Sequence, residues 1–295
     1  MTQQTALLPT VEWADDDVYQ VFCLCYARGR SRHVLDNFMI RDMHDGPMPL
    51  DYNVWIIRNR HRTILVDSGF SPRHADERGR PLDFNLLEGL AKLGLPPEEI
   101  EHVVITHLHY DHAGNIDGFP KAVFHVQDSE MAFATGRCLC VPQMRWAYDV
   151  EDVVAMVRRV YTDRAVFHDG DDKLFPGIDL YALNGHAAGV QGVKVNTPRG
   201  PVFLISDSSH YFANFATNRP FVLTLDAQQT LRTYRRIWEI GGSIDRIVPG
   251  HDPKIRRFYP GCTVNGLYLS LLHEQPRPFT VEEATRTDDF AGLED

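Results

Sequence analysis

Cysteine, positive charge and long apolar runs are all scarce in this chain of 295 residues. Its five cysteines are an odd number, which excludes a complete disulfide framework. Cys23-x-Cys25 and Cys138-x-Cys140 have the spacing of metal-binding pairs, but neither has a His or a further Cys nearby, so we interpret both as structural. The formal net charge of −10 disfavours a nucleic-acid partner, because a phosphate backbone requires a basic surface.

The sequence has no apolar stretch long enough for a membrane-spanning helix, so we expect no membrane partner. Residues 1–17 are polar and then acidic, and they lack the basic and apolar regions of a signal peptide. We therefore expect a cytoplasmic protein. The hydrophobic content of 43% and the charged content of 24% are typical of a globular protein, and the length allows one large domain or two small ones.

Three histidines and an aspartate occur within six consecutive positions, in the pattern H-x-H-x-D-H. They follow the apolar run 103–105, which we interpret as a buried strand leading into a loop at a sheet edge. In an extended loop His107 and His109 project to the same side, because side chains alternate with period two. Asp111 and His112 come from the turn that follows. Imidazole nitrogens and carboxylate oxygens suit zinc and related divalent ions, so the string predicts part of a two-metal site.

The string resembles the signature of the metallo-β-lactamase superfamily. This resemblance implies an α+β fold, an αββα four-layer sandwich whose two similar halves form one domain with the metals at one edge. Three further ligands are needed, and residue type and distance select His186, Asp207 and His251. Each of them follows an apolar or glycine-containing strand end. The resemblance covers the chain from about residue 51 to residue 251.

The second half of the chain repeats the order of the first. One expected hairpin ends in Asp67-Ser68 and another in Asp207-Ser208, and a His-bearing loop follows each at a similar interval. Two such half-folds make a single domain with its site at their seam. The expected hairpin strands are 52–58, 63–66, 192–196 and 202–206. The expected helices are 82–93, 127–135, 150–160 and 263–273, a polar turn is expected over 170–176, and the domain spans 1–295 with 1–17 and 280–295 loosely ordered.

The family's pattern implies a role for each of these side chains. One divalent metal would be held by His107, His109 and His186, and a second by Asp111, His112 and His251, with Asp207 bridging both. Zinc is the expected metal, with iron, manganese or cobalt as alternatives. A hydroxide shared by the two ions would attack a carbonyl, and Asp111 would carry a proton to the leaving oxygen. Asp67 would orient a ligand from beneath the site.

The segments 207–211 and 250–253 resemble the N-acyl-homoserine lactonase group, which is associated with quorum quenching. The resemblance implies a dinuclear metal-dependent hydrolase that opens an N-acyl-homoserine lactone or a similar small-molecule lactone. Lactonases of that group have a Tyr three positions after the bridging Asp. Here His210 stands at that position and Tyr211 follows it, so either can be the oxyanion donor. This departure leaves a pyridoxolactone-like or aromatic lactone open as the substrate.

Two other functions also stay open. A glyoxalase II-like thioesterase uses nearly the same ligands, but it needs a basic C-terminal site for glutathione and this tail is acidic. An iron-dependent sulfur dioxygenase or a non-catalytic metal sensor is the third hypothesis. The resemblance leaves a homodimer open as well. Apolar residues expected to bind substrate near the metals are Phe212, Phe215, Met43 and Trp146.

Overall fold

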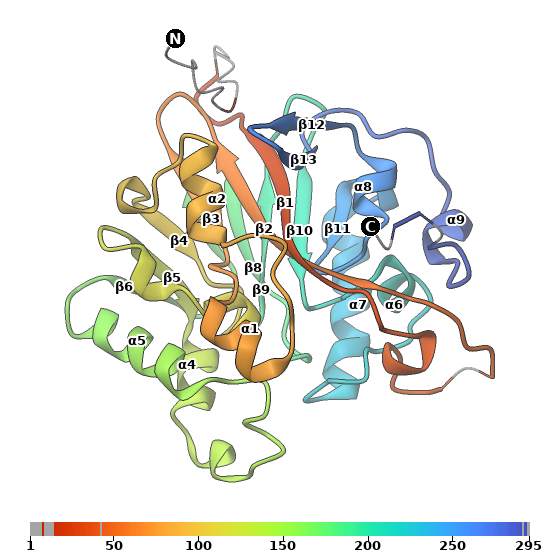
Figure 1. Ribbon diagram of the computed structural model, residues 1–295, viewed down its shortest axis with the longest axis horizontal. Helices are drawn as coiled ribbons and strands as arrows, with labels where there is room; N and C mark the ends of the chain where they lie inside the picture. The colour runs from red at the N-terminus through yellow and green to blue at the C-terminus, as the bar shows by residue number, and fades with distance from the viewer. Residues whose placement is uncertain (1–7, 9–14, 42, 291, 294–295) are drawn as a thin grey trace.

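Two β-sheets pack face to face at the centre of the protein, with helices on both outer sides (Figure 1). The computed structural model describes residues 8, 15–41, 43–290 and 292–293. The eight-stranded sheet has the order β12 (Gly261–Val264), β13 (Leu267–Leu271), β1 (Gln20–Gly29), β2 (Leu50–Arg58), β3 (Thr63–Val66), β4 (His102–Val104), β5 (Val123–Gln127) and β6 (Ala165–His168). The five-stranded sheet has the order β11 (Ile247–Pro249), β10 (Val202–Ser206), β9 (Gln191–Val195), β8 (Ile178–Ala182) and β7 (Asp172–Phe175).

The helices divide between the two outer sides in chain order (Figure 1). One side carries α1 (Pro72–Arg78), α2 (Leu86–Lys92), α4 (Asp128–Ala134) and α5 (Val150–Val160). The other carries α6 (Phe212–Ala216), α7 (Ala227–Gly241), α8 (Ile255–Phe258) and α9 (Val281–Thr285). The short α3 (Tyr110–Ala113) lies within the histidine string, and the 3₁₀ turns are η1 (Val34–Asp36), η2 (Pro97–Glu99), η3 (Ile116–Gly118), η4 (Arg137–Cys140) and η5 (Ile244–Arg246).

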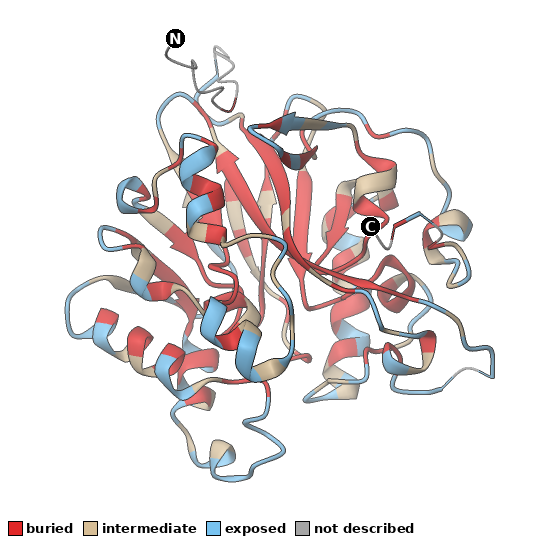
Figure 2. Cartoon of the chain, in the orientation of Figure 1, coloured by how far each residue is buried: buried red, intermediate tan, exposed pale blue. Residues whose placement is uncertain are grey.

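The central strands are buried on both faces (Figure 2). In β1, Val21 and Cys23 belong to the core between the sheets, whereas Phe22 and Leu24 belong to the core that also contains Leu90 of α2. This division follows from the period-two alternation of side chains along a strand. Because both faces are covered, these strands read in the sequence as near-continuous apolar runs.

The pairing pattern of the first half recurs in the second. β2 pairs antiparallel with β3, which pairs parallel with β4, and β9 pairs antiparallel with β10, which pairs parallel with β11. The predicted sandwich of two similar halves is therefore confirmed. In parallel neighbours the carboxyl ends of the strands meet at one edge of the sheet, so each half delivers its loops to the same place.

The tail differs from its prediction, because residues 263–273 do not form a helix. They belong to β12 and β13, an antiparallel hairpin that extends the large sheet by pairing with β1. Asn265 and Gly266 form its turn with φ of 49° and 81°. Asn-Gly with two positive φ angles is a strong two-residue hairpin signal, and it outweighs the helix-like spacing of the apolar residues around it.

Other predicted boundaries also shift. The helix expected over 82–93 begins only after Asn85, whose side chain accepts hydrogen bonds from the N–H groups of Leu87 and Glu88. The polar turn expected over 170–176 contains β7, an edge strand. The helix predicted over 150–160 is confirmed, and that over 127–135 matches α4 to within a residue at each end.

The two ends of the chain were expected to be loosely ordered. Residues 1–7 and 9–14 of the N-terminal segment lie outside the described residues. The C-terminal segment contains α9, and Phe290 and Leu293 beyond it are buried in the core. Within the described part of the chain, no helix is both long and apolar enough to cross a bilayer.

A row of histidines joins the parallel strands β4, β5 and β6. His102 Nδ1 lies 3.2 Å from His125 Nε2, and His125 Nδ1 lies 3.2 Å from His168 Nε2. The row ends at Asp172, whose carboxylate is 2.7 Å from His168 Nδ1. Burial, reinforced by His102 and His168, lowers the pKa of His125 to about 3.

Replacing His125 with Gln is expected to make the free energy of unfolding depend less on pH in the acidic range. Between the folded pKa of about 3 and an unfolded pKa of about 6.5, the unfolded chain binds a proton at this side chain and the folded chain does not. The contribution of neutral His125 is therefore full above the unfolded pKa and lost as pH falls, by at most about 1.4 kcal/mol per pH unit. Urea unfolding at several pH values should show the advantage of the wild type over the variant shrinking as pH falls. A constant difference would contradict the assignment.

Candidate metal centre

Loops from both sheets converge at one edge of the sandwich. The histidine string follows β4 of the large sheet, while His186, Asp207 and His251 follow β8, β10 and β11 of the small one. Ring centroids lie 4.2 Å apart for His107 and His112, 4.8 Å for His109 and His186, and 5.5 Å for His112 and His251. The structure thus brings together all seven side chains that the sequence predicted as ligands: His107, His109, Asp111, His112, His186, Asp207 and His251.

The seven side chains form two groups that share one carboxylate. In the first group, Asp207 Oδ2 lies 3.3 Å from His186 Nε2 and 3.9 Å from His107 Nε2. In the second, Asp207 Oδ1 lies 2.8 Å from His251 Nε2 and 3.4 Å from His112 Nε2. Each oxygen of Asp207 therefore faces a different set of imidazole nitrogens, which is the arrangement expected of a bridging ligand.

Several atoms at this centre are buried without a partner. Among the described residues, His107 Nε2, His112 Nε2 and Asp207 Oδ1 make no hydrogen bond of acceptable geometry, although Asp207 Oδ1 lies close to His251 Nε2. An unsatisfied buried polar atom costs about 1–3 kcal/mol, so three of them in one place indicate a missing group. Burial, together with the neighbouring histidines, lowers the pKa of His107 and of His109 well below the usual value, which leaves neutral imidazoles with free lone pairs. This donor set fits divalent zinc or a similar ion.

Hydrogen bonds on the far side of the rings orient three of the histidines. Nδ1 of His186 lies 2.7 Å from the carbonyl oxygen of Leu223, and Nδ1 of His251 lies 2.7 Å from that of Asp51. Because a carbonyl oxygen can only accept, Nδ1 must carry the proton in both rings. The proton on Nδ1 leaves the Nε2 lone pair directed at the cluster, as a metal ligand requires.

Asp67 orients the ring of His112 in the same way, and it also anchors the start of the histidine string. Its Oδ2 lies 2.7 Å from His112 Nδ1 and accepts from Thr106 Oγ1 at 2.9 Å, and its Oδ1 accepts from the Thr106 N–H at 2.7 Å. Burial raises the pKa of this carboxyl, while His112 and Thr106 oppose the rise. The structure therefore places Asp67 beneath the site, where it orients a predicted ligand.

Glu130 on α4 is a second positioning group, whose role the sequence did not predict. Its carboxylate is fully buried and accepts from the N–H of Leu108 at 2.9 Å, from the N–H of Gly189 at 2.8 Å and from the hydroxyl of Tyr148 at 2.9 Å. It thereby ties the histidine string to the loop that carries His186. The only available signal was an acidic residue on the inward face of an expected helix.

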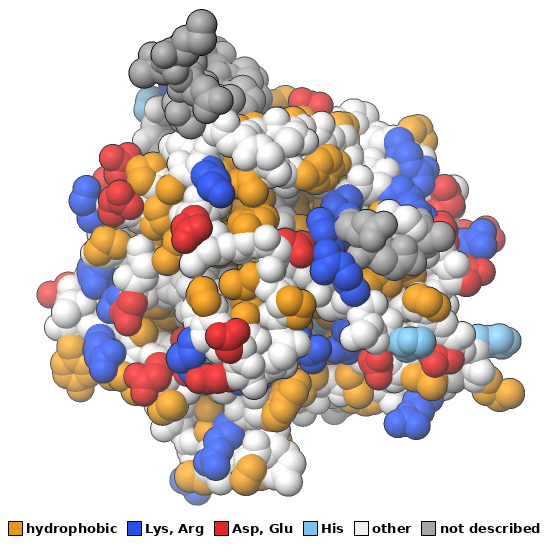
Figure 3. All heavy atoms as spheres, in the orientation of Figure 1, with side chains coloured by type: hydrophobic (Ala, Val, Ile, Leu, Met, Phe, Trp, Pro, Cys, Tyr) orange, Lys and Arg blue, Asp and Glu red, His pale blue; other side chains and the backbone are white. Residues whose placement is uncertain are grey.

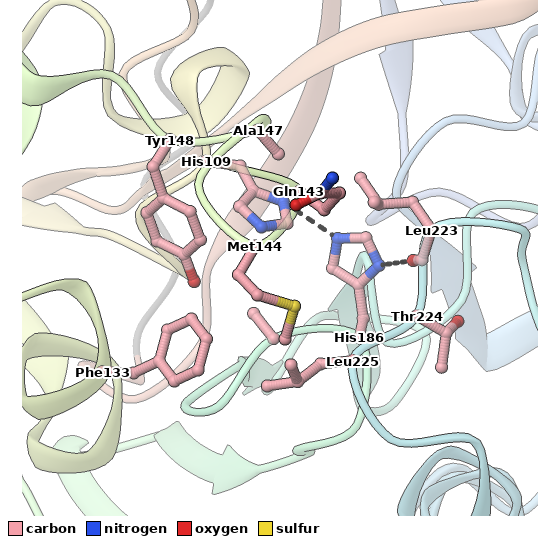
Figure 4. A pocket seen from close by; sticks show the side chains of 11 residues that line it. His109, Phe133, Gln143, Met144, Ala147, Tyr148, His186, Leu223, Thr224 and Leu225 are labelled. Carbon is pink, nitrogen blue, oxygen red and sulfur yellow. Dashed lines mark hydrogen bonds between the residues drawn. The ribbon is translucent and has the colours of Figure 1, made fainter. Parts of the chain in front are cut away.

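Two adjoining pockets open onto the cluster and share His109, Ala147, His186 and Leu223. The first, called the apolar pocket below because no described Asp, Glu, Lys or Arg residue lines it, has Phe133, Met144 and Leu225 in its walls together with the ring of His186 (Figure 4). The second extends over the other ligand group and is lined by Arg32, Leu50, Tyr52, Arg80, Tyr110, Asp111, Trp146, Asp207, His210, Phe221, Val222 and His251, besides the shared four. The segments 143–148 and 221–225 thus supply walls of the two pockets beside the cluster.

Of the four predicted substrate-binding residues, only Trp146 lines these pockets. Met43 is 97% exposed and lies outside both of them. Phe212 and Phe215 are fully buried, and they pack in the core against Phe258 and Trp238. These three predictions are corrected. Phe212 and Phe215 belong to α6, which turns both aromatic side chains into the core, whereas Met43 extends into solvent.

The structure separates the two candidate oxyanion donors. His210 lines the second pocket, its Nε2 lies 3.1 Å from Asp207 Oδ2, and its ring stacks on Phe221 at a centroid distance of 3.4 Å. Tyr211 is fully buried, and its hydroxyl hydrogen bonds to the carbonyl oxygen of Pro49 at 3.1 Å. The expectation of a catalytic Tyr211 is therefore corrected, because its hydroxyl serves packing rather than the pocket.

This architecture defines a class: metal-binding αββα sandwiches with a His- and Asp-lined centre at one edge. The chain matches the family described as the metallo-beta-lactamase superfamily over residues 47–251. It belongs to that superfamily.

Curated relatives include lactonases. The chain is 30% identical over 179 residues to the N-acyl homoserine lactonase AiiB of Agrobacterium fabrum, a match that covers 55% of this chain and 64% of that protein. It is 27% identical over 239 residues to an N-acyl homoserine lactonase of a Bacillus species, which covers 75% of this chain and 88% of the relative. The match with AiiB thus spans less than two thirds of that protein.

Solved structures show the same fold. A quorum-quenching N-acyl homoserine lactone lactonase superposes with a TM-score of 0.70 at 23% identity, covering 86% of this chain and 99% of that one. An N-acyl homoserine lactone hydrolase with N-hexanoyl-L-homoserine bound at its catalytic metal centre gives 0.67 at 22% identity, covering 88% and 100%. The dizinc quorum-quenching lactonase AidC gives 0.65 at 15% identity, covering 94% and 99%. At these identities the similarity establishes the fold alone.

Replacing Asp67 with Asn is expected to weaken zinc binding about 10- to 100-fold. Asn tolerates the φ of 65° at this position and can still accept from the Thr106 N–H, but it loses the carboxylate oxygen that faces His112 Nδ1. Competition with a chelator measures the affinity. Asp163→Asn is the matched control, because Asp163 is exposed and also has a positive φ of 56°. Equal affinity in the two variants would argue against an orienting role for Asp67.

Proposed function

We propose that this protein is a dinuclear metal-dependent hydrolase that opens a lactone ring, with an N-acyl-homoserine lactone or a similar lactone as substrate. The observation that carries the proposal is the position of Asp207, whose two oxygens face two separate sets of imidazole nitrogens beside a pocket open to small molecules. The names of the curated relatives support the choice of a lactone.

Two metal ions would account for the unsatisfied atoms of the cluster. We propose zinc, with iron, manganese or cobalt as alternatives. One ion would be held by His107, His109 and His186, the other by Asp111, His112 and His251, with Asp207 shared. Bound divalent ions supply a water acidified towards neutral pH and polarise a carbonyl oxygen.

Asp111 is the group that we propose to carry a proton to the leaving oxygen. It lines the second pocket, and about 12% of its side chain is exposed, more than that of Asp207 at 3%. The hydroxyl of Tyr26 donates to its backbone carbonyl at 3.1 Å and holds this turn in place. When the ring C–O bond breaks, the leaving alkoxide needs a proton. The Asp111 carboxylate would take that proton from the attacking water and deliver it to the alkoxide.

His210 is the group we propose to donate a hydrogen bond to the developing oxyanion. Its ring stacks on Phe221, and its Nε2 N–H is directed at Asp207 Oδ2. With metal ions bound to Asp207, the lone pairs of that carboxylate would be taken up, which leaves this N–H for the oxyanion. A donor fixed before reaction does not need to reorganise as charge develops, which is the basis of oxyanion stabilisation.

Replacing His210 with Gln is expected to lower kcat about 100-fold with a smaller change in KM. Tyr211→Phe is expected to leave kcat within about twofold, because its hydroxyl bonds to Pro49 outside the pocket. Steady-state kinetics on the preferred lactone, with metal content matched between samples, make the comparison. If Tyr211→Phe were the more damaging change, the donor would be misassigned.

The function itself is tested by a panel of homoserine lactones of several acyl lengths and of aromatic lactones, on protein of measured metal content. We expect the ring-opening activity to be lost when the metal is stripped. In Asp207→Ala the activity should fall more than about 100-fold, because replacing even a residue that only hydrogen bonds to a ligand lowers activity about 10- to 100-fold. Full activity in metal-stripped protein would refute the proposal. Turnover of S-lactoylglutathione but of no lactone would favour a thioesterase instead.

A further inference from the structure

Two arginines of the second pocket, Arg32 and Arg80, are not paired with a carboxylate. In the part of the chain that the structure describes, no carboxylate oxygen lies within ion-pair distance of either guanidinium. Other arginines of the same region are paired. Arg28 and Arg30 contact Asp83, and Arg73 contacts Asp149 and Glu77.

Arg32 is held in place by neutral acceptors only. Its Nε donates to Asn37 Oδ1 at 2.8 Å and its Nη2 to the carbonyl oxygen of Asp36 at 2.6 Å. Asn37 is fully buried and donates in turn to the carbonyl oxygen of Met48 at 2.9 Å. The guanidinium also lies 5.3 Å from the ring of Phe221, the ring on which His210 stacks. Arg32 is thus fixed beside the proposed oxyanion donor with its charge unneutralised.

Arg80 reaches the same pocket from the other wall. It follows Gly79, the left-handed C-cap of α1, and its N–H donates to the carbonyl oxygen of Ala75 at 2.9 Å. Its half-buried side chain lines the pocket beside Tyr52 and Tyr110. A neighbouring hollow is lined by Arg32 and Arg80 again, together with Arg41 and one acidic residue, Asp36.

The acidic side chains near the second pocket have other partners in the structure. The carboxylate of Asp36 accepts from the N–H of His33 at 2.9 Å, and that of Glu77 is paired with Arg73 at 2.8 Å. Asp207 faces the histidine cluster, and so does Asp111, which also attracts the Arg80 guanidinium through space without forming an ion pair with it. By contrast, no Lys or Arg occurs among the described residues that line the apolar pocket. The positive charge is therefore confined to one side of the cluster.

We propose that the natural substrate carries a carboxylate, which Arg32 and Arg80 bind while the scissile carbonyl lies at the cluster. This inference rests on the lactone hydrolase function proposed above. A guanidinium forms short, charge-assisted hydrogen bonds with a carboxylate, and these are stronger where water is partly excluded. A neutral acyl chain would leave both guanidinium groups partly desolvated with no anion beside them. The carboxylate thus selects among lactones, and the apolar pocket accepts the remainder of the molecule.

The test uses two pairs of lactones that differ in one carboxylate. These are N-succinyl- against N-butanoyl-homoserine lactone, and γ-butyrolactone-γ-carboxylate against its carboxamide. The variants are Arg32→Gln and Arg80→Gln, with Arg158→Gln as the matched control, since Arg158 is exposed on α5 away from the pockets.

We expect the wild type to prefer the carboxylate member of at least one pair by about 10-fold or more in kcat/KM. Each pocket variant should raise KM for that member about 10-fold with little change in kcat, as loss of a charge-assisted bond predicts. The control variant should change kcat/KM by less than about twofold for every lactone. The pocket variants should lower kcat/KM for the neutral members by a smaller factor than for the carboxylate members. Calorimetry of the ring-opened N-succinyl-homoserine should show the same loss of affinity without any turnover.

The possible outcomes distinguish a failure of the carboxylate site from a failure of the proposed lactone hydrolase function. If both members of each pair are hydrolysed equally well and the variants match the control, the carboxylate site is wrong although the lactonase function stands. If metal-loaded protein hydrolyses no lactone, the proposed function fails and calorimetry decides the site. In that case weaker binding of N-succinyl-homoserine by the pocket variants would support the site, and unchanged binding would overturn it.

Discussion

The carboxylate of Asp207 lies buried between two sets of imidazoles, and the surrounding structure serves to hold it there. Burial alone would raise its pKa, but His210, His251 and His112 hold that pKa well below the usual value, so the group is an anion. A buried anion is stable only beside compensating positive charge or donors. The same constraint that makes this carboxylate expensive to bury makes it suited to join two cations, and it explains why loops from distant parts of the chain must meet at this point.

Hydrogen bonds across the seam fix how the two halves meet. Thr106 Oγ1 of the first half lies 2.8 Å from Ser206 Oγ of the second, and the Gln191 N–H donates to the carbonyl oxygen of Thr106 at 2.9 Å. Asp67 and Glu130 extend this scaffold beneath the ligands. Positions held by several buried hydrogen bonds have little freedom to relax, so the centre is organised before any ion or substrate binds.

The pocket above this centre is electrostatically divided. Its apolar part lies beside His186, whereas Arg32 and Arg80 stand over the part next to Asp111 and His251. The chain as a whole is acidic, with a formal net charge of −10. Net charge therefore bears on large partners such as nucleic acid, whereas the charges that line the pocket bear on the small molecules that can enter it.

The sequence by itself determined the sandwich and the repeated strand order, and it selected the seven side chains that the structure brings together, because strand ends and residue types are local patterns that can be read along the chain. It could not determine which way a side chain points when distant segments pack against it. Tyr211 and His210 are adjacent in sequence, yet only His210 faces the pocket, since the start of α6 turns its neighbour toward Pro49. Likewise, that Glu130 joins two loops, or that Arg32 is left without an anion, depends on contacts between residues far apart in the chain, which only the tertiary structure decides.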